Sequence, residues 1–261
     1  AEIIAITNAI HLPTWVDPRI IDTAVKGEDI SGIHQENKQA LVDFIQERNG
    51  AELDPNKLII GFSRRAAPYK RSDLIFTKPE VIEPYLADQR IQIVFSGKAH
   101  PLDDKGKGIV EKLVAMSKKY PNSVVFLENY GMEIGAMLTR GSDIWLNNPR
   151  RPLEASGTSG MKAAMNGVMN FSILDGWWPE ACDHGINGWQ FGDGFESKND
   201  EEVDKHDLAA LYNVLLNEVI PTFYDDQPKW KEMMKASVVS TYEYFNVKRM
   251  LEEYNEKMYL V

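Results

Sequence analysis

Residues 154–167, which read EASGTSGMKAAMNG, hold the groups most able to do chemistry. Glycine and hydroxyl residues open the segment, and a short helix is expected to follow them. Such a helix start leaves backbone N–H groups unpaired and unshielded, which makes an anion site without a metal. Lys162 follows Gly160 by two residues, so its amine lies close enough to bond covalently to a carbonyl ligand whose phosphate rests on the turn. This pattern suggests pyridoxal phosphate. The plainer alternative is a helix N-cap followed by an ordinary surface lysine.

A cluster of cations comes directly after the apolar run 58–62. Arg64, Arg65, Lys70 and Arg71 stand within eight positions. Charge clusters are usually solvated faces, but this one falls where a parallel sheet binds anions, and the guanidinium fork suits phosphate oxygens. We therefore interpret this segment as a phosphate site.

Other loops offer weaker candidates. Tyr130, in the loop 128–131, carries a phenol that either flanks a flat ring or simply packs. Asn8, His11 and Trp15 lie in a turn-rich connection near the start of the chain, and loops of this kind often carry function. A tryptophan beside two prolines is nevertheless more often packed than functional, which favours a structural role for Trp15.

Three further features of the sequence are the tryptophans, a Cys-Asp-His run and an acidic run. Trp177, Trp178 and Trp189 lie near carboxylates, a combination that suits sugar binding and suits the anchoring of a large loop equally well. The run 182–184 is Cys-Asp-His, but consecutive residues cannot all face one ion, so we reject a structural metal site. The acidic run 200–207 is interpreted as a solvated helix start and nothing more.

The elements that position these residues alternate between strand and helix. Short apolar runs of the buried-strand type are separated by segments long enough for a helix, a pattern typical of a parallel sheet covered on both faces. The sequence therefore predicts a Rossmann-like α/β domain with ligand loops after each strand. The expected strands are 58–62, 91–95, 124–127, 143–146 and 168–172, with a further strand at 1–6. The expected helices are 35–48, 108–119, 132–140, 208–220, 229–239 and 247–259.

Composition limits the classes of partner. The chain has 261 residues, is 43% hydrophobic and carries a net charge of −10, so it can bury a substantial core and repels nucleic acid and anionic membranes. Cys182 is the single cysteine, which excludes an internal disulfide and indicates a reducing compartment, the cytoplasm by default. No apolar run approaches the length of about 18 residues that a membrane helix needs.

Several of these motifs together resemble the α-glucan phosphorylases, the glycogen, starch and maltodextrin enzymes. The segment 154–167 is similar to the family's cofactor helix, and the likeness recurs in register over nearly the whole chain. The matching segments are Thr7-Asn8 with Trp15, Arg65 to Arg71, Gly97-Lys98-Ala99, Phe126 to Tyr130 and Asn147 to Lys162. The last of these follows the short, unregulated branch of the family. Gly131, where the long branch has an arginine, departs from the long-branch pattern.

The resemblance implies pyridoxal phosphate as the cofactor. Lys162 would carry it covalently, and Lys162, Arg65 and Lys70 would be the catalytic residues. Arg65 and Lys70 would hold the substrate phosphate beside the cofactor phosphate. Arg64, which stands where the long branch has a lysine, is placed with the cofactor. The remaining residues implied for the cofactor are Thr158, Ser159 and Gly160 at its phosphate and Tyr130 and Trp15 at its ring.

The same resemblance implies the reaction and the substrate contacts. Inorganic phosphate would cleave the end of an α-1,4-glucan and give glucose 1-phosphate and a glucan shortened by one unit. The residues implied for the glucose unit are Glu154, Ala155, Ser156 and Gly157 at its hydroxyl groups and Asn8 at its hydroxymethyl end.

The family has two Rossmann-like domains of the GT-B type with the active site between them. Residues 1–261 would be the C-terminal domain, with 225–261 as a helical end segment, and the N-terminal domain would be a missing partner. We expect the full enzyme to be a homo-oligomer and this fragment to be inactive alone. Two alternatives stay open: a nucleotide-sugar glycosyltransferase of the glycogen synthase type, in which Arg65 and Lys70 grip a diphosphate, and a glucan-binding module that relies on the tryptophans.

Overall fold

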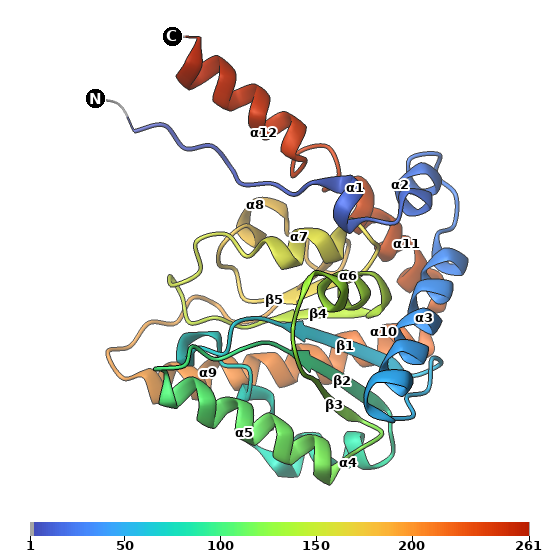
Figure 1. Cartoon of the computed structure of the whole chain (residues 1–261), viewed down its shortest axis with the longest axis vertical. Helices are drawn as coiled ribbons and strands as arrows, with labels where there is room; N and C mark the ends of the chain where they lie inside the picture. The colour runs from blue at the N-terminus through green and yellow to red at the C-terminus, as the bar shows by residue number, and fades with distance from the viewer. Residues whose placement is uncertain (1–2, 261) are drawn as a thin grey trace.

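A six-stranded parallel sheet lies at the centre of residues 3–260, the part of the chain that the computed structural model describes (Figure 1). The strands lie in the order β3-β2-β1-β4-β5-β6, and every neighbouring pair is parallel. Their bounds are β1 Leu58–Ser63, β2 Ile91–Ser96, β3 Val124–Leu127, β4 Ile144–Asn147, β5 Met169–Ser172 and β6 Gly188–Gln190. The α/β class is confirmed. Chain order reverses between β1 and β4, and ligands bind beyond the carboxyl ends of strands at such a point.

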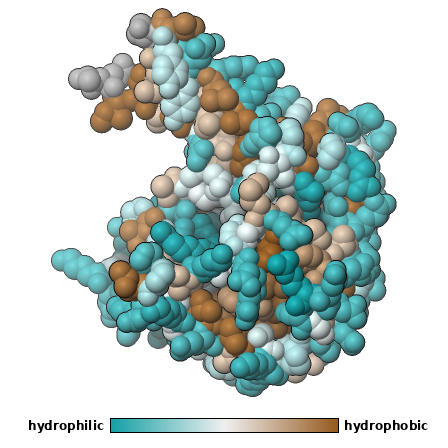
Figure 2. Space-filling model, viewed as in Figure 1, coloured by the Kyte–Doolittle hydropathy of each residue, from teal (hydrophilic) through white to brown (hydrophobic). Residues whose placement is uncertain are grey.

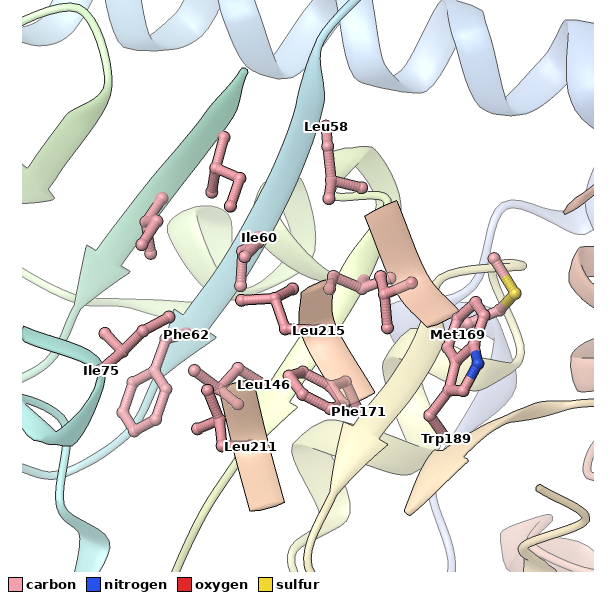
Figure 3. Packing of buried hydrophobic residues seen from close by; sticks show 14 of the residues in the cluster. Leu58, Ile60, Phe62, Ile75, Leu146, Met169, Phe171, Trp189, Leu211 and Leu215 are labelled. Atoms are coloured by element: carbon pink, nitrogen blue, oxygen red, sulfur yellow. The ribbon is translucent and has the colours of Figure 1, made fainter. Parts of the chain in front are cut away.

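Both faces of the sheet are buried. Side chains alternate along a strand, so Leu58, Ile60 and Phe62 of β1 join one apolar cluster while Ile59 joins a second cluster on the opposite face. Figure 3 shows the first cluster, in which the β1 side chains lie with Phe171 of β5 and leucines of the covering helix. Burial on both faces explains why the sequence shows continuous apolar runs instead of an alternating pattern.

Helices cover the two faces (Figure 1). On the face of Figure 3 lie η2 Leu74–Phe76, α4 Pro79–Ala87, α5 Asp104–Lys119, α9 Asp200–Val214, the π-helical turn η3 Leu215–Val219 and α10 Ile220–Asp225. On the other face lie α3 Ser31–Asn49, α6 Met132–Gly141 and α7 Thr158–Ala164. The remaining elements are α1 Leu12–Trp15, α2 Pro18–Ala24, η1 Pro68–Lys70, α8 Trp178–Ala181, α11 Gln227–Val239, α12 Val247–Tyr254 and η4 Asn255–Tyr259.

Local sequence sets where several helices begin and end. Asp103 and Asn199 accept hydrogen bonds from backbone N–H groups in the first turns of α5 and α9, and Asn246 does the same for α12 with an N–O distance of 3.0 Å. A side chain of this kind stabilises a helix by about 1 kcal/mol. Helix α3 ends at Gly50, whose φ of 78° is left-handed and favours glycine.

The first residues of the chain correct one prediction. A strand was expected at 1–6, but the described part of this segment, from Ile3 onward, is extended without strand pairing, and Ala1 and Glu2 lie outside the described residues. The first sheet-like contact comes at Ile10, whose N–H donates to Phe245 O at 2.9 Å. Ile3 is 97% exposed, so its hydrophobicity signals no burial in this part of the protein.

The N-terminal segment and α12 project together from the body of the protein (Figure 1). Hydrophobic residues appear on this projecting part in Figure 2, and Leu251, Met258 and Tyr259 of α12 and η4 are exposed. No helix among the described residues is both long enough and apolar enough to cross a membrane.

Candidate active site

Helix α7, which carries Lys162, is held tightly at the carboxyl edge of the sheet. Its chain enters through Gly157, whose φ of 80° is left-handed. At Gly160 a side chain has no space, because a Cβ there would lie 2.5 Å from Asn170 Oδ1 and 2.7 Å from Trp177 Nε1. Asn170 Nδ2 donates to Gly160 O at 3.0 Å and joins the helix to β5. Gly160 therefore serves close packing, and its own N–H donates to Gly157 O at 3.0 Å.

The Lys162 amine is desolvated and unpaired. Its Nζ lies 3.2 Å from the centre of the Trp15 ring, and within residues 3–260 it has neither a hydrogen bond nor an ion pair. Burial lowers the pKa of Lys162 from 10.5 to about 8, which leaves about a tenth of the amine neutral at pH 7. A neutral lysine amine is a nucleophile toward carbonyl groups. Lys162 is therefore suited to covalent chemistry and is not an ordinary surface lysine.

Trp15 is fixed against α7 from behind by residues that the sequence analysis did not single out. Its carbonyl oxygen accepts hydrogen bonds from Arg140 Nε at 3.0 Å and from Asn166 Nδ2 at 3.1 Å. Asn166 also accepts from the N–H of Asp17 at 2.9 Å and donates to Lys162 O at 2.8 Å. A buried asparagine two residues after a helix is the only sequence signal for this clamp. It sets where the indole lies relative to the amine.

The two aromatic residues expected to flank a ring do lie together. A Cβ at Gly135 would lie 3.0 Å from Tyr130 Oη and 3.4 Å from the Trp15 ring. Both side chains are half-buried. Helix α6, on which Gly135 lies, thus brings Tyr130 to the indole that faces Lys162.

A buried ion cluster joins the loops after β1 and β4. Glu154 Oε2 accepts from Arg64 Nη2 at 2.6 Å and from Lys70 Nζ, and the three side chains are 5–8% exposed. Arg64 also donates to Asn147 at the end of β4. Burial lowers the pKa of Arg64, and the facing carboxylate only partly offsets this. Two cations therefore share the carboxylate of Glu154, and Asp175 adds a further negative charge close to Arg64.

Arg65 and Arg71 of the same segment differ in exposure and in bonding partners. Arg65 is exposed and has no polar partner in the described part of the chain. Arg71 is buried and its guanidinium bonds Asn148 O at 2.8 Å, Pro149 O at 2.9 Å and Asp204 Oδ1 at 2.9 Å. Arg71 therefore ties loops together, and only Arg65 of this pair is free to meet a ligand.

The loop 154–157 is held from below by the turn that follows β5. Asp175 Oδ2 accepts from the N–H of Glu154 and Oδ1 accepts from the N–H of Gly176, both at 2.9 Å. The N–H of Trp177 donates to Ser156 O, also at 2.9 Å. A Cβ at Gly176 would lie 2.4 Å from Ser156 O, so the two turns touch. The Asp-Gly pair after an apolar run is the sequence signal for this clamp.

Other expected site residues are arranged as follows. Ser159 Oγ accepts from Trp145 Nε1 at 3.3 Å, so its own O–H is free to donate. Ser156 Oγ is buried without a polar partner in the described structure. Ala155 is exposed beside it and Thr158 is half-buried. Asn8 is exposed and bonds only its neighbour, the N–H of Ala9, among the described residues.

The structure decides between the two roles considered for the tryptophans and corrects the interpretation of the acidic run. Trp177, Trp178 and Trp189 are 0–2% exposed, so they anchor their loops and offer no face to a sugar. The acidic run 200–207 is more than a solvated helix start: Asp204 pairs with Arg150 at 2.6 Å as well as with Arg71, and Asp207 pairs with Arg71 at 2.8 Å. Within residues 3–260, no group of His, Cys, Asp and Glu side chains is arranged to hold a metal ion.

Comparisons with known proteins agree with the motifs. Residues 18–212 match the family model described as carbohydrate phosphorylase. The chain is 38% identical to a maltodextrin phosphorylase of Thermococcus litoralis, over 97% of this chain and 35% of that protein. It is 38% identical to a glycogen phosphorylase of Aquifex aeolicus, over 97% of this chain and 43% of that protein. A glycogen phosphorylase of Mycobacterium tuberculosis is 33% identical over 98% of this chain and 35% of its own length. The chain thus spans less than half the length of these relatives.

Proposed function

We propose that this chain, which belongs to the carbohydrate phosphorylase family, is the cofactor- and phosphate-binding part of an α-glucan phosphorylase. In the proposed reaction, inorganic phosphate cleaves the terminal α-1,4 bond of a glucan and releases glucose 1-phosphate. The single observation that carries the proposal is Lys162: a desolvated, unpaired amine with a lowered pKa that faces an indole at the carboxyl edge of the sheet.

The residues around Lys162 fit pyridoxal phosphate. The amine is free to bond an aldehyde, Trp15 supplies aromatic surface next to it, and Tyr130 lies close to Trp15. Thr158, Ser159 and Gly160 would hold the cofactor phosphate, and the free O–H of Ser159 supports this. When bound, the cofactor would supply a phosphate group that takes part in proton transfer with the substrate phosphate. The residues of the protein would bind and orient the cofactor and balance the charge of its phosphate.

The cation cluster supports a second phosphate. Two phosphates held in contact repel each other, so such a site needs several positive groups. Arg64 and Lys70 share the single carboxylate of Glu154, and Arg65 adds an exposed cation. We propose that Arg65 and Lys70 bind the substrate phosphate and that Arg64 lies toward the cofactor. Glu154 would hold the cations in place until a phosphate arrives.

The loop 154–157 would bind the glucose unit. Its carboxylate, its serine hydroxyl and its backbone groups offer the donors and acceptors that sugar hydroxyls need. The unpartnered Ser156 hydroxyl supports this role, because a buried polar group without a partner is costly unless a ligand satisfies it. Asn8 would reach the hydroxymethyl end of the same glucose.

The rest of the enzyme is also part of the proposal. The chain spans 35% and 43% of the length of the two relatives described first. We propose that a further domain of the GT-B type covers the carboxyl edge and completes the glucan cleft, and that residues 1–261 alone do not turn over glucan.

Reduction of a mixture of the purified chain and pyridoxal phosphate with borohydride tests the proposal. Peptide mass analysis should find the pyridoxyl group on Lys162 in preference to exposed lysines such as Lys107. The variant Lys162→Arg keeps a positive charge but should lose the adduct. A wild-type chain with no adduct at Lys162 would favour a nucleotide-sugar transferase, which needs no such bond.

A further inference from the structure

A cavity lies beside the loop 154–157, which we call the glucose loop because we propose that it binds the glucose unit. It has a volume of about 510 Å³ and is enclosed by the loops after β4, β5 and β6. Leu153 and Leu174 line it. Leu153 directly precedes the glucose loop, and Leu174 directly precedes Asp175, which bonds the N–H of Glu154 in that loop. Figure 1 shows the chain between β6 and α9 at the same edge of the sheet as the other ligand loops. We call this space the side cavity.

Phe195 presents a rigid aromatic surface in the side cavity. The residue is 42% exposed, yet its ring stacks on His206 with 4.6 Å between the ring centres and 25° between the planes. Asp193 Oδ1 bonds His206 Nε2 at 2.9 Å and accepts from the N–H of Phe195 at 3.1 Å. One face of the ring is therefore covered and fixed. The ring contributes to none of the buried clusters, so core packing does not explain its position.

The charges of the side cavity exclude an anionic ligand. Its lining includes the carboxylates of Asp193, Glu196 and Asp200 and only two arginines. One of these, Arg150, is already engaged by Asp200 at 2.7 Å and by Asp204 at 2.6 Å. A phosphate or a nucleotide would meet an excess of negative charge here, in contrast to the cation cluster around Glu154.

The remaining lining suits a neutral carbohydrate. Leucines and Phe195 contribute apolar surface to the lining, and Gln190, Ser197 and Arg151 contribute polar groups. A pyranose ring combines a C–H face that packs on an aromatic ring with hydroxyl groups that bond amides and carboxylates. The volume falls within the range of about 300–1,000 Å³ that is typical of small-molecule sites.

We propose that the side cavity binds a glucosyl unit of the glucan chain, away from the unit that is cleaved, with Phe195 as its stacking surface. This inference rests on the proposed function, because it names how the substrate of the same edge is held beyond the glucose loop.

Calorimetric titration of the purified chain with maltoheptaose tests the inference. Phe195→Ala should weaken binding about tenfold, and Phe195→Trp should retain it. Leu153→Ala, which truncates another apolar lining residue, should weaken binding about threefold. The matched control is Tyr244→Ala, which removes an aromatic ring of similar exposure, 47%, outside the cavity, and should leave binding unchanged.

Three results would overturn the inference: no binding by the wild-type chain, unchanged binding by Phe195→Ala, or an equal loss in Tyr244→Ala. Circular dichroism of each variant identifies any that fails to fold, and Leu153→Ala then decides in place of Phe195→Ala. The lysine adduct separates this failure from failure of the proposed function. A pyridoxyl group on Lys162 without glucan binding contradicts the side cavity alone, whereas glucan binding through Phe195 without an adduct contradicts the cofactor proposal alone.

Discussion

Two lysines, the buried Lys38 and the half-buried Lys162, are treated in opposite ways. Lys38, at the amino edge, lies 2.7 Å from Asp143 Oδ2 and also donates to Lys57 O at 2.7 Å. The Lys162 amine faces the Trp15 indole and has no ion pair or hydrogen bond within residues 3–260. A buried charge is normally paired or neutralised. The protein pairs the first lysine and leaves the second without a counter-charge, at a lowered pKa of about 8.

Two carboxylates, Asp143 at the amino edge and Glu154 at the carboxyl edge, also differ in how their charge is matched. Asp143 is fully buried, and burial opposes its charge, but Lys38 and His34 outweigh this and hold its pKa below the ordinary value. Its Oδ2 also accepts from the N–H of Ile59 at 2.7 Å. Glu154 instead is one carboxylate that pairs with both Arg64 and Lys70. The charge of Asp143 is thus matched by cations around it, whereas two cations share the charge of Glu154.

The largest expected effect comes from breaking the amino-edge pair. Asp143→Asn removes the charge that faces Lys38 and leaves a buried ammonium without a counter-charge. We expect the free energy of unfolding at pH 7 to fall by about 3–5 kcal/mol, measured by urea denaturation. A loss below about 1 kcal/mol would show that the two edges do not differ as described.

A smaller effect is expected at the glucose-loop clamp. Asp175→Asn keeps the shape of the side chain but replaces one acceptor by a donor that faces the N–H of Glu154 or Gly176. The free energy of unfolding should fall by about 1–3 kcal/mol, and amide hydrogen exchange at Glu154 should accelerate. Unchanged exchange at Glu154 would mean that Asp175 does not hold the loop. The same measurement on Asp183→Asn serves as a control outside the clamp.

The smallest effect on stability is expected at Lys162 itself. Lys162→Met removes an unpaired, partly desolvated charge, so the free energy of unfolding at pH 7 should stay within about 1 kcal/mol of the wild-type value or rise. A loss as large as that of Asp143→Asn would abolish the contrast between the two lysines.

The pH dependence of stability sharpens the same comparison. The folded pKa of Lys162, about 8, lies below the ordinary value of 10.5, so between these values the unfolded chain binds more protons than the folded chain. Stability from this group therefore rises with pH across that window and is lowest below pH 8. Lys162→Met should remove this rise. An identical pH profile in the wild-type chain and the variant would contradict the lowered pKa.

The parts of the fold that sequence reasoning identified are those decided by local pattern. The strand 124–127 was predicted with the bounds of β3, because burial on both faces leaves a continuous apolar run. The strand β6 was missed, since it has only three residues and Trp189 within it was considered only as a sugar-binding or a loop-anchoring residue. The acidic run 200–207 was misjudged because its partners, Arg71 and Arg150, come from distant loops.

In the candidate site, too, local sequence pattern predicted some residues and long-range contacts decided the others. Motif chemistry pointed to Lys162, and the structure brings Trp15 to its amine and Tyr130 close to Trp15, from segments far away in the sequence. The clamps made by Asn166 and Asp175 were not foreseen, because each depends on which backbone groups lie opposite in the folded chain. Local pattern reveals reactive groups, and only the fold reveals what positions them.

The central claim is that the carboxyl edge keeps one lysine unpaired and partly neutral so that it can react. Trace labelling of the chain with acetic anhydride at a series of pH values, read out peptide by peptide, gives the titration of Lys162 directly. The account predicts a midpoint at about 8. A midpoint at the ordinary lysine value of 10.5 would contradict it.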